Sequence, residues 1–246
     1  MFIKRVDKFL ALGLRRKVLY RKFFKRTFDI IISFLGLVCL APLMFAVAAA
    51  IRFDSKGPAI FKSPRVGKNG KVFNCYKFRS MSIEAPKAEA TRNIDSGLYL
   101  TKVGKVIRKL SIDELPQLFN ILTGDMSIIG YRPVVVTEED LIGYRQDLGV
   151  DKYLPGLTGL AQISGRDELT DMQKKAMIDA TYCQNITFSN DCRIFFKTIG
   201  YVLTKQGIVE GSEPIKVKKA VVVPITYAGL DSHINSNKND DIGIGA

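Results

Sequence analysis

The stretch KLSIDELPQLFNIL, residues 109–122, places an acid pair, Asp113 and Glu114, between two predicted helices. Apolar residues follow the pair at the spacing of one buried helical face, at Leu115, Leu118, Phe119 and Leu122. The same spacing precedes the pair, at Val103, Val106, Ile107 and Leu110. Cations occupy the rest of the first helix, at Lys102, Lys105, Arg108 and Lys109. The pattern predicts two amphipathic helices whose junction carries two carboxylates beside several positive charges.

The start of the second helix has two possible caps. Ser111 and Glu114 fit a capping box, in which Glu114 does no more than cap the helix. Pro116 favours a start at Asp113, because a proline in the first helical turn loses no intrahelical bond. We therefore expect Asp113 to cap the helix, exposed and ionised, and Glu114 to face apolar neighbours. A surface ion pair is the simpler alternative, and the acid pair alone does not exclude it.

The composition points to anionic partners. The 246 residues suffice for one domain with a substantial core, and 37 Lys and Arg against 24 Asp and Glu give a net charge of +13. Nucleic acid, phosphorylated substrates and acidic lipid are the partners that such a charge attracts. His233 is the only histidine, and the cysteines show no zinc or redox spacing. Catalysis is therefore expected to rest on carboxylates and cations, with or without a hard metal.

An uncharged run of 22 residues, 30–51, is the strongest membrane signal in the sequence. As one helix it would be about 33 Å long, enough to cross a hydrocarbon core of about 30 Å. Pro42, near its middle, removes a backbone donor and predicts a bend. Both flanks are basic, and a single span would place one of them outside, against the positive-inside rule. The residues alone leave two interpretations open, a full span and a re-entrant helix that returns to the side it entered from.

A cleaved signal peptide is a third interpretation of this run, because residues 46–48 fit an A-x-A cleavage site. The basic region ahead of the run, with ten Lys and Arg between Lys4 and Arg26, is much longer than such signals need. Cleavage would also leave three cysteines, an odd number, in an oxidising compartment. Both observations disfavour a signal peptide.

The rest of the chain predicts an α+β domain that is mostly helical. Asn69-Gly70 is a favoured turn between two strand-like runs, which predicts a β-hairpin. A short strand is expected over 126–129, an irregular loop over 153–166, and helices over 168–184 and 193–209. The last helix has an apolar stripe that suits either the core or a membrane interface. We expect four segments: basic and amphipathic (1–28), membrane helix (29–52), cytosolic domain (53–212) and a partly disordered extension (213–246).

Four motifs together resemble the bacterial sugar transferase family, the monotopic polyprenyl-phosphate phosphoglycosyl transferases. They are KRTFD (25–29), GPAIFKSPRVGKNGKVFNCYKFRSM (57–81), KVGKVIRKLSIDELPQLFNILTGDMSIIGYRP (102–133) and PGLTGLAQISGR (155–166). The resemblance runs from about residue 25 to 209, and the run through the acid pair is highly specific. Only a basic stretch precedes it, so we expect the small form of the family, without the four-span bundle of longer relatives.

The resemblance implies an α+β catalytic domain on a re-entrant N-terminal helix broken at Pro42, with amphipathic interfacial helices, at the cytoplasmic face of a bacterial inner membrane. It implies Mg²⁺-dependent transfer of a sugar phosphate from a nucleotide (UDP) diphosphate sugar to polyprenyl (undecaprenyl) phosphate. The implied nucleophile and metal ligand is Asp113, and Glu114 is its catalytic neighbour. The implied phosphate-binding residues are Arg108, Arg132, Arg166, Lys77 and Arg79. Anionic lipid and downstream glycosyltransferases are the further partners expected, and nucleic acid is not.

The chain departs from the family pattern at three positions. Ala41 replaces a serine before Pro42, so the bend depends on proline alone. Tyr131 replaces the first proline of P-R-P, and Ala161 replaces a frequent aromatic residue, which suggests altered sugar or nucleotide preference. Two other functions compete with the enzyme. A tethered nucleic-acid binder predicts stacking platforms or a recognition helix, which the sequence lacks. A membrane scaffold without catalysis gives no reason for the acid pair.

Overall fold

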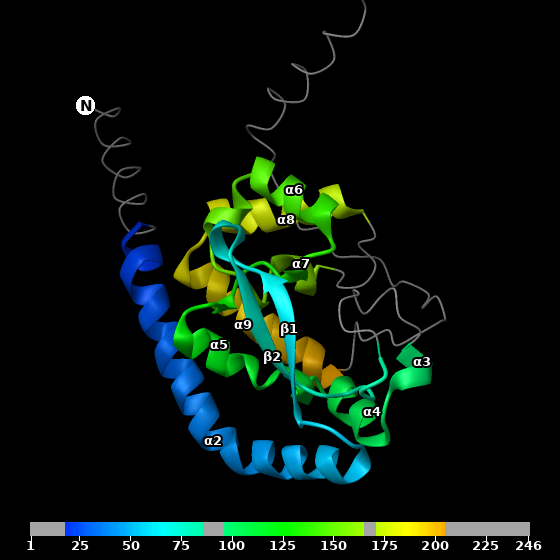
Figure 1. Ribbon diagram of the computed structural model, residues 1–246. Coiled ribbons are helices and arrows are strands. Elements are labelled where there is room, and N and C mark those ends of the chain that lie inside the picture. The colour runs from blue at the N-terminus through cyan, green and yellow to red at the C-terminus, as the bar shows by residue number, and fades with distance from the viewer. Residues whose placement is uncertain (1–17, 86–95, 165–170, 205–246) are drawn as a thin grey trace, which may run out of the picture. The chain divides into compact units, whose positions relative to one another are not determined.

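The computed structural model describes residues 18–85, 96–164 and 171–204 (Figure 1). The predictions for residues 1–17 and 205–246, and for Arg166, lie outside these ranges. A π-helical turn, η1 (Tyr20–Phe24), leads into the long helix α2 (Lys25–Asp54). The helices that follow are α3 (Ser96–Tyr99), α4 (Lys102–Lys109), α5 (Gln117–Thr123), α6 (Glu139–Asp147), α7 (Leu160–Ile163), α8 (Met172–Gln184) and α9 (Phe188–Thr204). The fold is α+β and mostly helical, as predicted.

The predicted hairpin is confirmed. Strand β1 (Ile60–Val66) pairs antiparallel with β2 (Val72–Phe78), and Ser63 lies opposite Cys75. Asn69 and Gly70 both have positive φ angles, 55° and 72°, in the turn between them. A short strand, β4 (Val134–Val135), pairs with the other edge of β1, so the sheet order is β2-β1-β4. The sheet therefore brings the chain after the acid pair back beside the hairpin.

The Gly- and Pro-rich segment that we expected to be irregular contains regular structure. Strand β5 (Gly156–Thr158) pairs in parallel with β3 (Ser127–Ile129), and helix α7 follows at once. Gly156 is required by the close approach of the two strands, because a Cβ there would lie 2.1 Å from the backbone nitrogen of Gly130. The prediction failed because the pairing joins segments that are remote in sequence, and local composition does not report such contacts.

Helix α2 bends partway along its length and packs on the domain through both of its halves (Figure 1). Pro42 lies inside the helix, where it removes one backbone donor. Before Pro42, Leu37 and Leu40 pack against the core cluster to which α5 contributes. After Pro42, Val47 and Ile51 are buried in a second cluster with residues of α4 and β2. In the described part of the chain, α2 is the one helix long and apolar enough to cross a membrane, by length and composition.

Polar contacts hold both ends of α2 to the same domain. At its start, Arg26 donates to the carbonyl of Ile121 at 2.7 Å, and Lys25 forms an ion pair with Asp191 of α9 at 2.7 Å. At its end, the Asp54 carboxylate accepts a hydrogen bond of 2.9 Å from the backbone of α4. The remaining surface of α2 is largely apolar and exposed, and Phe45 and Phe53 keep 77% and 92% of their exposure. One long helix is thus anchored at two places on one domain and leaves an apolar face uncovered.

Candidate active site

The acid pair lies in a short 3₁₀ turn, η4 (Ile112–Glu114), between α4 and α5. Ser111, which precedes the turn, has a φ of 55° in the left-handed region, where a residue with a side chain is uncommon. Helix α5 begins only at Gln117, so Asp113 is not its cap. The expectation that Asp113 is exposed is also wrong, because only 7% of Asp113 and 9% of Glu114 is exposed. The tight turn between two packed helices buries both carboxylates.

Glu114 is the centre of an ion-pair cluster. Its Oε1 accepts a hydrogen bond of 2.9 Å from Lys77 Nζ on β2 and one of 2.7 Å from Arg132 Nη2. The Arg132 side chain keeps 30% of its exposure, and the charge of Glu114 raises the pKa of Arg132 above its usual range. The expectation that Glu114 faces apolar neighbours is therefore wrong. Burial of a carboxylate requires charged partners, and the tertiary fold supplies them.

Asp113 has a different environment. Within the described residues no group donates a hydrogen bond to its carboxylate. Burial raises the pKa of Asp113, and the negative charge of Glu114 raises it further, whereas Lys77, Arg108 and Arg132 oppose the rise. Asp113 is thus a carboxylate of increased basicity that nearby cations favour in its ionised form. Such a group is suited to attack an electrophile that arrives with its own negative charge.

The structure brings together three of the five predicted phosphate-binding residues. Lys77, Arg108 and Arg132 all act electrostatically on Asp113. Arg79 is directed elsewhere: its guanidinium donates to the carbonyls of Ser55 and Lys56 at the end of α2, and the side chain is buried. Arg166 lies outside the described residues. The cation cluster consisting of Lys77, Arg108 and Arg132 is the part of the predicted set whose charges act on the acid pair.

Two polar contacts that the sequence did not indicate hold the acid pair against the hairpin. Asn120, fully buried on α5, accepts a hydrogen bond from the backbone N–H of Tyr76 at 2.9 Å and donates to the carbonyl of Asn74 at 2.8 Å. Its amide thus occupies the outer edge of β2 in the way that another strand would. Because Lys77 follows Tyr76 directly, Asn120 fixes the strand from which Lys77 reaches Glu114.

A buried network supports Arg132 from the other side. Arg145 on α6 forms an ion pair of 2.6 Å with Asp179 on α8 and donates to the backbone carbonyl of Arg132 at 3.0 Å. Its guanidinium also stacks on the ring of Tyr131, 4.7 Å from the ring centroid. Tyr131, one of the three departures from the family pattern, is buried and contacts Arg145, the residue that supports the backbone of Arg132. Spacing alone could not reveal this network, because its members come from three separate segments.

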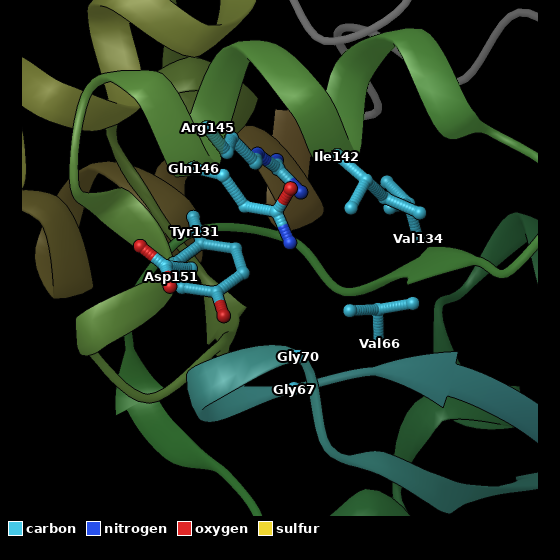
Figure 2. A pocket seen from close by; sticks show the side chains of 9 residues that line it. All are labelled: Val66, Gly67, Gly70, Tyr131, Val134, Ile142, Arg145, Gln146 and Asp151. Carbon is cyan, nitrogen blue, oxygen red and sulfur yellow. The ribbon is translucent and has the colours of Figure 1, made fainter.

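A small cavity lies beside this network (Figure 2). Figure 2 shows Arg145, Gln146, Tyr131 and Asp151 around it, with the hairpin turn on the opposite side. Neither acid of the pair lines it, so we do not assign it to the reaction.

Asp113 offers a carboxylate to a divalent cation. Mg²⁺ typically takes one or two protein carboxylates and completes its shell with water and substrate phosphate oxygens. Asp113 fits that requirement, since its carboxylate accepts no hydrogen bond from the described residues, whereas Glu114 is engaged by two cations. The described ranges contain no cluster of three acidic, histidine or cysteine side chains, so any such ion would depend on the substrate for further ligands.

Comparisons with known proteins agree with the motifs. The family described as "Bacterial sugar transferase" matches residues 20–205. The undecaprenyl-phosphate galactose phosphotransferase of Salmonella typhimurium is 44% identical over 204 residues, which cover 76% of this chain and 42% of that protein. The exopolysaccharide production protein ExoY of Sinorhizobium fredii is 39% identical over 201 residues, 74% of this chain and 87% of that protein.

A third relative, the UDP-glucose:undecaprenyl-phosphate glucose-1-phosphate transferase of Klebsiella pneumoniae, is 38% identical over 185 residues, 72% of this chain and 39% of that protein. The chain therefore matches about two-fifths of the length of several curated relatives, including those of Salmonella and Klebsiella, and most of the length of ExoY.

Proposed function

This chain belongs to the bacterial sugar transferase family, and from that premise we propose that it transfers a sugar 1-phosphate from a nucleotide diphosphate sugar to polyprenyl phosphate. The observation that carries the proposal is the buried carboxylate of Asp113, which accepts no hydrogen bond from the described residues and whose ionised form is favoured by the charges of Lys77, Arg108 and Arg132. The names of two relatives, those of Salmonella and Klebsiella, contain undecaprenyl phosphate, and the second also contains UDP-glucose. We therefore propose undecaprenyl phosphate as acceptor and a UDP-sugar as donor.

The first half of the proposed reaction is a nucleophilic displacement. An oxygen of the Asp113 carboxylate attacks the β-phosphorus, and the bond from that phosphorus to the bridging oxygen breaks. The bridging oxygen leaves with the α-phosphate as nucleoside monophosphate, so no proton has to move. The product on the protein is an aspartyl-phosphosugar. Cations near Asp113 lower the repulsion between its carboxylate and the diphosphate. Such electrostatic stabilisation supplies most of the catalysis of phosphoryl transfer.

The second half transfers the phosphosugar to the acceptor. An oxygen of polyprenyl phosphate attacks the phosphorus of the adduct and releases the Asp113 carboxylate in its original form. The product, a polyprenyl-diphospho-sugar, is a membrane-bound acceptor for glycosyltransferases that extend a glycan. This places the enzyme at the first membrane step of polysaccharide or glycoconjugate assembly.

Glu114 has a supporting role in this proposal. Its Oε1 holds Lys77 and Arg132 together, although their like charges repel. The two cations are thereby positioned beside the carboxylate that attacks. Mg²⁺, bound by Asp113 and the diphosphate, would neutralise further charge on the substrate.

We also propose that α2 is re-entrant. Lys25 and Arg26 at its start and Asp54 at its end all contact the same domain. A domain on one side of the membrane can hold both ends only if the helix returns to that side, and the bend within α2, the helix that contains Pro42, permits this. The basic flanks support the cytoplasm as that side, by the positive-inside rule. The exposed apolar face of α2 would then contact lipid, and anionic headgroups would attract the flanking cations.

One assay tests the function. The purified protein in detergent is incubated with Mg²⁺, undecaprenyl phosphate and, in turn, each of a panel of UDP-sugars. We expect release of uridine monophosphate with at least one sugar, dependent on both substrates for repeated turnover. A membrane scaffold or a nucleic-acid binder would release none, and that result across the panel would reject the proposal.

A further inference from the structure

Arg65 was not among the residues expected at the site, yet it shares a face of the sheet with Lys77. Side chains at alternate positions of a strand point to the same face, and paired residues of neighbouring strands share it. By this register Ser63 and Arg65 on β1 lie on the same face as Cys75 and Lys77 on β2. Lys77 reaches Glu114 from that face. Arg65 therefore belongs to the surface against which the acid pair packs.

The guanidinium of Arg65 has little to compensate its charge. Its Nε donates to Ser63 Oγ at 3.0 Å, which holds the side chain across the sheet face. In the parts of the chain that the structure describes, its two terminal nitrogens have neither a hydrogen bond nor an ion pair. The side chain is half-buried. Burial lowers its pKa most, and the positive charge of Arg132, the largest charge effect on it, lowers it further.

A half-buried arginine beside a second arginine is unfavourable unless an anion joins them. Arg132 is already paired with Glu114, whereas the terminal nitrogens of Arg65 are not paired within the described residues. The carboxylates of Glu138 and Glu114 raise the pKa of Arg65, but less than the charge of Arg132 lowers it. These observations point to a negatively charged ligand at Arg65.

The position of Arg65 shows which part of a diphosphate sugar it can meet. Lys77 lies opposite Phe61, so Arg65 is four residues further along β1, about 13 Å at 3.3 Å per residue. The end of the hairpin near Phe78 packs with α4, the helix that carries Arg108. The turn end, beyond Arg65, lies by α6 (Figure 1). The cations thus form a row from Arg108 beside Asp113, through Lys77 and Arg132, to Arg65.

In-line displacement fixes the direction of the leaving group. The attacking oxygen and the departing oxygen lie on opposite sides of the phosphorus. If Asp113 attacks from one end of the row, the α-phosphate departs toward the other end. The helices on the Asp113 side, α4 and the second half of α2, expose apolar residues such as Val106 and Phe53, which suits the lipid acceptor.

We propose that Arg65 binds the α-phosphate of the donor, the phosphate that leaves as nucleoside monophosphate. This inference rests on the proposed function and goes beyond it by assigning the nucleotide side of the site. Arg65 forms charge-assisted hydrogen bonds to that phosphate through its terminal nitrogens, and Ser63 orients it. The attacked phosphate remains between Asp113 and the cation cluster.

Equilibrium binding of uridine monophosphate to the full chain in detergent, followed by calorimetry, tests the assignment. Arg65→Ala is expected to weaken binding by about ten- to a hundredfold, the loss of a charge-assisted contact. Arg65→Lys should fall between the two, because lysine keeps the charge but loses the planar fork. Lys62→Ala is the matched control, since Lys62 is exposed on the opposite face of the same strand. It should bind uridine monophosphate as the parent does.

A stability measurement separates loss of a ligand from loss of the fold. Because Arg65 is repelled by Arg132, Arg65→Met should raise the melting temperature or leave it unchanged while nucleotide affinity falls. A drop in the melting temperature of both Arg65→Met and Arg65→Lys would show a structural role and overturn the assignment.

The outcomes distinguish this inference from the function on which it rests. A parent protein that releases no uridine monophosphate from any donor rejects both. A parent that turns over, with equal nucleotide affinity in Arg65→Ala, rejects only the role of Arg65. Unchanged nucleotide affinity with slower transfer from a preformed adduct to undecaprenyl phosphate would place the acceptor phosphate at Arg65 and overturn the assignment to the donor.

Discussion

Replacing Glu114 by glutamine removes the one negative charge that joins Lys77 and Arg132. Both cations bond to the same atom, Oε1, at 2.9 Å and 2.7 Å, and the Glu114 side chain keeps 11% of its exposure. Glutamine keeps the shape and one acceptor oxygen but leaves two cations without their counter-charge. Loss of this charge-assisted contact should cost about 1.5–3 kcal/mol of unfolding free energy. For a domain of this size that is a fall in melting temperature of about 3–12 °C.

The pH dependence of Glu114→Gln gives the sharper result. In the proposed reaction Asp113 must be ionised to attack, so we expect the burst of nucleotide release to be lost as the pH falls through the pKa of Asp113. The charge of Glu114 raises that pKa, and Lys77 and Arg132 lower it. The variant loses the effect of the Glu114 charge on the pKa of Asp113 and keeps the opposing charges of Lys77 and Arg132. The acid limb of the burst should therefore move to lower pH, while the rate on the plateau falls by about ten- to a hundredfold because the two cations, still near Asp113, are no longer held in a fixed orientation.

The assay is single-turnover release of uridine monophosphate between mildly acidic and neutral pH, with donor and Mg²⁺ but no acceptor. Glu84→Gln, at an exposed position after β2, is the control for the loss of one negative charge. An acid limb that stays in place or moves to higher pH would refute the view that Glu114 acts on Asp113 through charge. A full plateau rate would refute the view that Glu114 positions Lys77 and Arg132.

Three further predictions follow from named contacts. Asp113→Asn should abolish both the burst of nucleotide release and the adduct seen by mass spectrometry. Because the pKa of Asp113 is raised in the folded state, its ionised form destabilises the fold at any pH above the folded pKa. The variant should therefore melt at a higher temperature than the parent at neutral pH, and a lower melting temperature would contradict this assignment. Asp179→Asn leaves the charge of Arg145 buried without its partner and should lower the unfolding free energy by about 3–5 kcal/mol, measured by chemical denaturation. Turnover should also slow, because Arg145 supports the backbone of Arg132. The exposed control Asp140→Asn should change neither quantity. Tags placed before residue 25 and after residue 56 should both be reachable only from the cytoplasmic side, and labelling of either one from outside intact cells would establish a full span.

Several elements could be predicted from the sequence because the forces that form them act between near neighbours. The apolar spacing of 103–110 predicted α4, and Asn69-Gly70 predicted the hairpin, since the turn residues themselves adopt the positive φ angles that it needs. The long apolar run predicted α2, and Pro42 predicted its bend. The motifs predicted the family, which the match over residues 20–205 confirms.

The chemical state of the acid pair required the tertiary structure. Sequence spacing placed Asp113 in water and Glu114 against apolar residues, but both are buried, and Glu114 carries the ion pairs. Its partner Lys77 comes from a strand 37 positions earlier in the chain. Burial and charge depend on which distant segments pack together, and a helical period contains no information about them.

The sequence by itself therefore determined the local elements, the long apolar helix and the family. Only the tertiary structure decided which of the acids is paired, that Asn120 closes the edge of β2, and that Arg65 joins the face that carries Lys77. The physical reason is range: backbone preferences and amphipathic periods are set within a few residues, whereas desolvation and ion pairing are set by segments that meet only when the chain has folded.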